Sequence, residues 1–117
     1  MKVDKALALI TLQVLIEQGT KFNQIFYLSQ YERQRIKELY KQRLPNGFAN
    51  EDRYNTIGEI IKPITGKDVY VDGNTYLICD DKCVLTMTTE HTLADIAGVL
   101  DIKEAKPWQN KRASTTS

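Results

Sequence analysis

The sequence contains few of the residues from which catalytic and metal sites are built. It has one histidine, His91, and two cysteines, Cys79 and Cys83. A structural zinc site uses four cysteine or histidine ligands, which these three residues cannot supply. His91 precedes Asp95 by four residues, and such a pair can orient a general base, but no nucleophile motif accompanies it. We therefore predict a protein that is not an enzyme and needs no metal or cofactor, with His91 on the surface at a helix start.

Disulfides, a large net charge and long apolar runs are also missing. Two cysteines are too few for a disulfide scaffold, and a net charge of +1 does not make a polycation. The apolar stretch from Ala6 to Ile16 is too short to cross a bilayer, and Thr11 and Gln13 interrupt it in a way that is untypical of a secretion signal. We expect a cytoplasmic protein with reduced thiols and no membrane partner.

What the chain does contain is the composition of one folded domain. It has 117 residues, of which 42% are hydrophobic and 26% charged. A chain of this size can bury a core without disulfides or metal. We expect a single α+β domain over residues 1–105 and a flexible polar tail over residues 106–117.

Helical patterns dominate the first half of the chain. Ser29 and Glu32 have the spacing of a capping box, which predicts a helix over residues 30–44. Asn50 is the expected cap of a further helix that Pro63 limits, and Thr92 opens the last helix. Two more helices are predicted: one over residues 5–18, between a cap at Asp4 and a stop at Gly19, and one over residues 20–28, from apolar spacing.

The pattern changes to that of strands after residue 67. Asp72 and Gly73 lie between two runs rich in β-formers, which is a strong hairpin signal. Strands are predicted near residues 68–71, 75–79 and 83–88. The predicted fold class is α+β, with N-terminal helices packed on a three-stranded antiparallel meander and a C-terminal helix after it.

The first helix has apolar residues on nearly every side. Such a helix is either the centre of the core or one side of a dimer seam. In the second case one strip of side chains fills the core, and the other is left for a second copy of the chain. The candidate self-association strip consists of Leu9, Leu12 and Ile16.

Charge is unevenly distributed along the chain. Residues 1–47 carry eight basic and four acidic side chains, a net charge of +4, whereas residues 68–104 carry two basic and eight acidic ones, a net charge of −6. A basic helix over residues 30–44 can follow the phosphates of a nucleic acid, or it can be a solvated face whose charges pair with one another. The candidate nucleic-acid contacts are Arg33, Arg35, Lys37, Lys41 and Arg43.

Residues 92–105 resemble the first helix and turn of a helix-turn-helix motif. The resemblance ends there, because Pro107 would interrupt the recognition helix that has to follow. We therefore expect a small non-catalytic regulatory or interaction protein that binds another protein chain, with a homodimer as one form of this. The alternative is a nucleic-acid-binding, DNA- or RNA-directed regulator that uses the basic helix.

Overall fold

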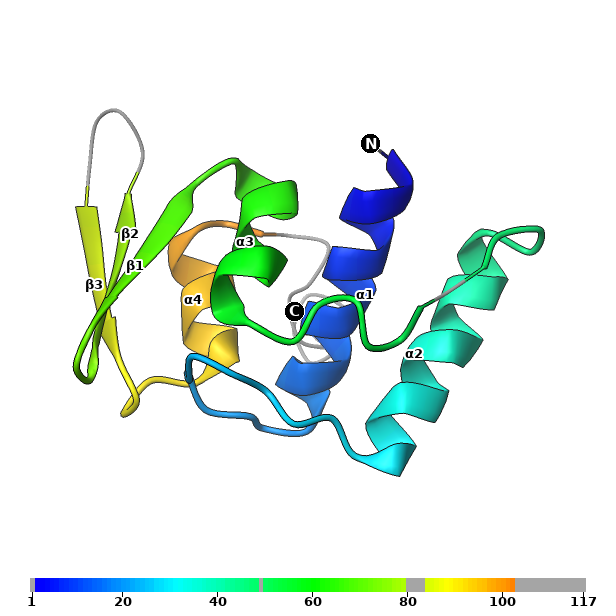
Figure 1. Cartoon of the computed structure of the whole chain (residues 1–117), viewed down its shortest axis with the longest axis horizontal. Helices are drawn as coiled ribbons and strands as arrows, with labels where there is room; N and C mark the ends of the chain where they lie inside the picture. Colours follow the sequence, from blue (N-terminus) through cyan, green and yellow to red (C-terminus); the bar gives the residue numbers. More distant parts are fainter. Residues whose placement is uncertain (1, 49, 80–83, 103–117) are drawn as a thin grey trace, which may run out of the picture.

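The fold is seen in a computed structural model that describes residues 2–48, 50–79 and 84–102. Four helices and three strands occur in these residues, in the order α1, α2, α3, β1, β2, β3, α4 (Figure 1). The order matches the predicted α+β class, with helices before and after an antiparallel meander. The helices are α1 (Lys2–Glu17), α2 (Gln30–Arg43), α3 (Ile57–Thr65) and α4 (Leu93–Val99), and the strands are β1 (Asp68–Asp72), β2 (Thr75–Cys79) and β3 (Val84–Thr88).

Helix α1 is the centre of the core. It packs against α2, α3 and α4, and side chains all around it are buried. The predicted self-association strip is part of this core, because Leu9, Leu12 and Ile16 are only 6%, 0% and 7% exposed. The opposite strip is buried as well, so the single chain leaves no side of α1 between Leu7 and Ile16 for a second copy. The self-association hypothesis requires an exposed strip on α1, and the structure has none between Leu7 and Ile16.

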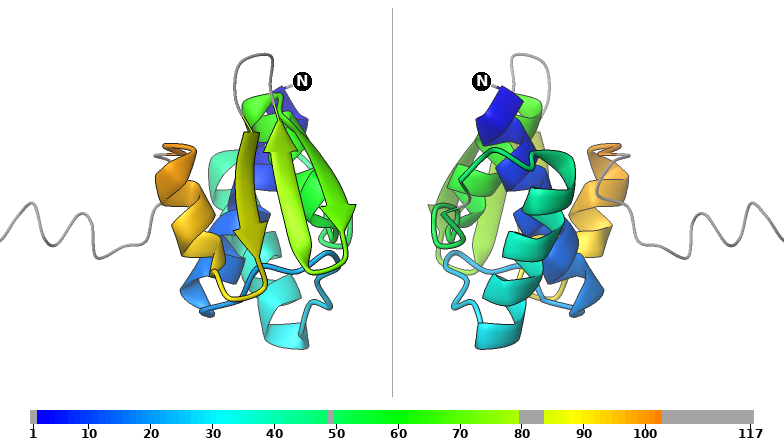
Figure 2. Two further views of the ribbon diagram at one scale, coloured as in Figure 1. Left: turned by 90° about the vertical axis from the view of Figure 1, so that its left-hand side faces the viewer. Right: turned by 90° about the vertical axis from the view of Figure 1, so that its right-hand side faces the viewer.

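All helices of the described residues lie on one face of the sheet. Its strands follow one another in the order β1-β2-β3, all antiparallel, and Figure 2 shows the other face turned away from the helices. Tyr76, Ile78 and Met87 point into the core, at 3%, 0% and 4% exposure. Because side chains alternate along a strand, Tyr70 on β1 and its partner Leu77 on β2 lie on the outer face. Strand β1 forms one edge of the sheet.

The hairpin between β1 and β2 closes differently from the simplest expectation. Asp72 pairs with Thr75, so the loop consists of Gly73 and Asn74 rather than of Asp72 and Gly73. Gly73 has a φ of 61°, and Asn74 is not among the residues with positive φ. A positive φ at the first loop position alone defines a type II′ turn, which favours glycine there.

The helix predicted over residues 20–28 is absent, and an extended segment takes its place. Its backbone bonds to the starts of two helices: the amide of Phe22 donates to the carbonyl of His91 at 2.8 Å, and the amide of Phe26 donates to that of Asn55 at 2.7 Å. These long-range bonds replace the helical ones. Buried Phe26 and Leu28 also flank exposed Tyr27, which is the alternation of an extended chain.

Two predicted helix boundaries are also corrected. Helix α3 is capped by Thr56, whose hydroxyl accepts from the amide of Glu59, rather than by Asn50. Pro63 lies inside α3, which ends at Gly66 in the left-handed conformation. The capping box predicted at Ser29 and the helix start predicted at Thr92 are confirmed, and Thr92 also forms a capping box with Asp95. The predicted tail over residues 106–117 lies outside the described residues.

No helix among the described residues combines the length and the apolar character that a membrane crossing needs.

Replacing Leu12 with alanine should lower the free energy of unfolding by about 2–5 kcal/mol, because a fully buried leucine leaves a cavity. Urea denaturation followed by circular dichroism measures this loss. Val99→Ala is the control, since Val99 is 55% exposed and its truncation should change stability by at most about 0.5 kcal/mol. Equal effects of the two substitutions would contradict the central place of α1.

Glycine-to-alanine substitutions should have opposite signs at Gly73 and Gly98. Alanine at Gly73 should destabilise the fold by about 1–2 kcal/mol because of the positive φ, although nothing lies within 4 Å of the added Cβ. Alanine at Gly98 in α4, where the space is equally open, should stabilise it by about 0.5 kcal/mol. Thermal unfolding measures both, and a stabilising Gly73→Ala would refute the type II′ turn.

Candidate functional site

Two basic side chains of α2 form ion pairs with the loop that precedes α3. The Arg33 Nε lies 3.1 Å from the carboxylate of Asp52, and the Lys37 Nζ lies 3.7 Å from that of Glu51. The chain after α2 turns back and runs beside the helix toward α3, which brings these acids opposite the bases (Figure 1). Both cations therefore face an anion of the same chain.

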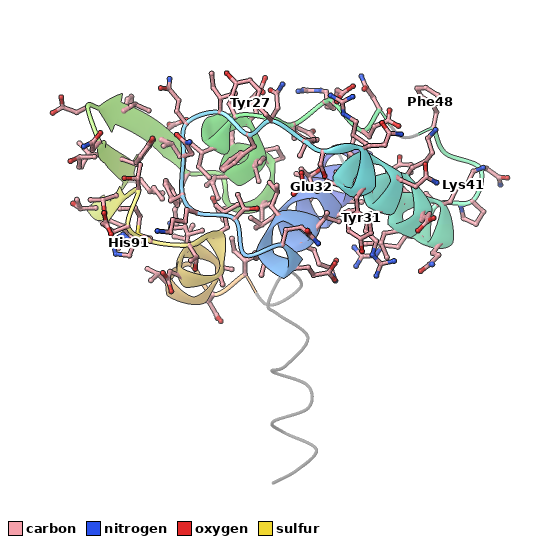
Figure 3. The ribbon with its side chains drawn as sticks, turned by 90° about the horizontal axis from the view of Figure 1, so that it is seen from below. Tyr27, Tyr31, Glu32, Lys41, Phe48 and His91 are labelled. Carbon is pink, nitrogen blue, oxygen red and sulfur yellow. The ribbon has the colours of Figure 1, made fainter. Side chains whose placement is uncertain are left out.

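The remaining bases of α2 are engaged to different extents. Arg35 lies 3.8 Å from Glu17 at the end of α1, and Arg43 donates to the side-chain oxygen of Gln13 at 3.4 Å. Lys41 is exposed, and no ion pair reaches it among the described residues. Figure 3 places it on the far part of α2, well away from His91.

The five bases of α2 are thus balanced by an equal number of acids that lie on the helix or in contact with it. The ion pairs are partly or fully exposed to water and contribute little to stability. Their effect on the surface potential is larger, because charges of both signs lie within a Debye length of about 8 Å in physiological salt. The five acids are Glu17, Glu32, Glu38, Glu51 and Asp52.

His91 has a structural partner. Its Nδ1 accepts a hydrogen bond from the amide of Thr88 at 3.1 Å, which makes the turn between β3 and α4. The carboxylate of Asp95 accepts from the amide of Thr92 at 2.9 Å as part of the capping box, so it does not orient the imidazole. Cys79 is half-buried, and among the described residues no three His, Cys, Asp or Glu side chains gather as metal ligands do.

A groove of about 610 Å³ runs between α3 and strand β1. One wall comes from α3 and the loop before it, and the other from the first part of β1. The groove is lined in part by charged and aromatic residues and by residues of the edge strand. These are Arg53, Glu59, Lys62, Asp68, Val69 and Tyr70. Sequence reasoning did not find this groove, because α3 and β1 meet there only after α3 has packed on α1.

The charges of the groove are paired with one another. Arg53 lies 3.8 Å from Glu59, and its guanidinium stacks 4.5 Å from the ring centroid of Tyr54. Lys62 lies 2.9 Å from Asp68. The two pairs are each neutral and include all the charged residues of the walls, so the groove has no net charge to hold a small ion.

Beside the groove, β1 presents an unpaired backbone edge. The residues that flank a two-residue hairpin loop bond to each other, so Asp72 and Thr75 exchange hydrogen bonds. The direction of backbone groups alternates along the strand, which turns the amides and carbonyls of Val69 and Val71 away from β2. No element among the described residues pairs with this edge. The arrangement offers hydrogen bonds to an extended chain.

Comparison with known proteins gives no relative for this chain: no family model matches it, and neither does any curated protein or solved structure. Its function is therefore argued from its own geometry.

Removing the acids that face α2 should create affinity for polyanions. The triple variant Glu17→Gln, Glu51→Gln and Asp52→Asn should elute later from a heparin column than the unmodified chain. Arg33 and Lys37 lose their ion-pair partners, and Arg35 keeps only Glu38. Its matched control, Asp72→Asn with Glu90→Gln and Asp101→Asn, changes the net charge equally at the other end of the molecule. Equal shifts for both triples would mean that net charge alone matters and that α2 is not specially masked.

Proposed function

We propose that this chain is a small non-catalytic interaction protein that acts by binding another protein chain. The observation that carries the proposal is the groove between α3 and β1, which lies along an unpaired strand edge. Backbone groups at a strand edge recognise extended polypeptides, and a neighbouring groove receives alternate side chains. Tyr70, 58% exposed on the outer face, adds aromatic surface of the kind that is enriched in protein interfaces.

The nucleic-acid alternative has less support. Phosphate binding depends on cations that are free to replace counterions. Of the five candidate contacts, Arg33, Arg35 and Lys37 face acids of the same chain, whereas Lys41 and Arg43 are exposed and have no ion pair among the described residues. A helix with three of its five bases paired to acids of the same chain presents only a weak positive potential to a nucleic acid.

Photo-cross-linking distinguishes the two functions. Tyr70 on β1 and Tyr31 on α2 are 58% and 59% exposed, so p-benzoylphenylalanine can replace either in the full chain with equal access to partners. In the cells that make the protein, we expect protease-sensitive adducts of discrete size from position 70. Nuclease-sensitive adducts from position 31 would support the alternative. Failure to find a polypeptide adduct at either position would overturn the proposal.

A further inference from the structure

The edge strand β1 carries a distinctive pattern of side chains. Asp68, Tyr70 and Asp72 alternate with Val69 and Val71, so the acids and the tyrosine lie on the outer face and the valines on the face toward the helices. A strand added beside β1 would have the same alternation. Its outer side chains would lie next to two carboxylates with an aromatic ring between them, and its inner ones next to valine and the groove.

The sheet and the segment that follows it are acidic. Within residues 68–79 and 84–102 the acidic side chains number five, and there is no lysine or arginine. Two cations lie close to the start of the strand: Lys67, which directly precedes Asp68, and Lys62 of α3, which pairs with Asp68. Both side chains of that pair are more than half exposed, at 55% and 54%, so an incoming cation can share or replace it. Asp72 has no ion pair among the described residues.

The same pattern disfavours a second copy of the chain at this edge. Two β1 strands paired antiparallel about Tyr70 would place Asp68 of one copy opposite Asp72 of the other. Like charges directly opposite each other destabilise a strand pair. Charges on an edge strand are a common device against such pairing. The edge therefore discriminates by charge among the extended chains that could add to it.

We propose that β1 receives an extended, basic segment of a partner protein as a fourth strand of the sheet. This segment alternates lysine or arginine with small or β-branched apolar residues. The cations lie beside Asp68, Tyr70 and Asp72, and the apolar side chains face Val69, Val71 and the groove along α3. The inference rests on the proposed function and specifies its partner and site.

The test measures binding of labelled peptides to the full chain by fluorescence anisotropy. The probe is a short peptide that alternates lysine with valine, and its comparison peptides carry glutamate in place of lysine or have the same residues with all lysines grouped. We expect the alternating basic peptide to bind more tightly than both. Equal binding of the grouped peptide would indicate attraction by charge alone and would overturn the strand addition.

Two variants locate the site. Asp72→Lys should weaken binding of the basic peptide by about tenfold, because an attractive pair becomes a repulsive one. Glu90→Lys makes the same charge change in the turn after β3, outside the edge strand, and should have a much smaller effect. Equal losses in the two variants would overturn the assignment to β1.

Backbone pairing has its own readout. On peptide binding, hydrogen exchange at the amides of Val69 and Val71 should slow, since these amides point away from β2. Unchanged exchange there would overturn the proposal. Val71→Pro removes one of these amides and should abolish binding, with circular dichroism as the check on folding. The amide readout in the unmodified chain remains decisive if this variant does not fold.

A second copy at the edge is tested by sedimentation of the full chain. A dimer that Asp72→Lys alters would mean that β1 pairs with itself, and this would overturn the inference. The cross-linking experiment separates the inference from the proposed function. Cross-linking to a polypeptide from Tyr31 with none from Tyr70 would leave a protein-binding protein whose site is not β1.

Discussion

The structure depends on the burial of α1 on all sides. Its buried side chains occupy nearly every direction around the helix, and no single neighbouring layer can cover such a surface. Helices α2, α3 and α4 therefore have to surround it. The extended segment after α1 supports this arrangement, because the amide of Leu93 donates to Thr20 and the amide of Ile57 donates to Gln24. One stretch of chain thus ties the starts of α3 and α4 to the helix that they cover, and the three-stranded sheet packs beside α3.

The distribution of charge along the chain differs from its distribution in the folded structure. Along the chain, residues 1–47 are basic, yet the fold returns Glu51 and Asp52 to α2 and brings Glu17 from α1 to Arg35. In the acidic second half, Lys62 of α3 pairs with Asp68, whereas Asp72 has no ion pair among the described residues. Residues 68–79 and 84–102 contain five acids and no lysine or arginine of their own. The end of the molecule that carries the sheet therefore keeps its negative charge, and the end that carries α2 loses most of its positive charge.

Local signals in the sequence predicted the parts of the fold that local chemistry decides. The capping box at Ser29, the helix start at Thr92 and the hairpin between β1 and β2 each involve groups within a few residues of one another. The sequence predicted each of them, although the hairpin loop consists of Gly73 and Asn74. The helix predicted over residues 20–28 was wrong because Phe22 and Phe26 bond to segments about 70 and 30 positions away, which no window of sequence reveals. The candidate site on α2 was identified by residue type, but its masking depends on acids from α1 and from the loop before α3. The groove could not be predicted at all, since it exists only between elements that the core brings together.

The groove gains rigidity from the same packing that buries α1. Helix α3 presents Ile57, Ile60 and Ile61 to the core at 2%, 0% and 0% exposure, so its opposite side is held at a fixed distance from the chain beyond it. Only Gly66 and Lys67 separate α3 from β1, which limits how far the strand can move relative to the helix. A partner strand that enters this groove would meet walls already in place, and little conformational freedom would be lost on the side of this chain. Preorganisation of that kind lets a short edge of five residues act as a binding surface, although its backbone hydrogen bonds are few.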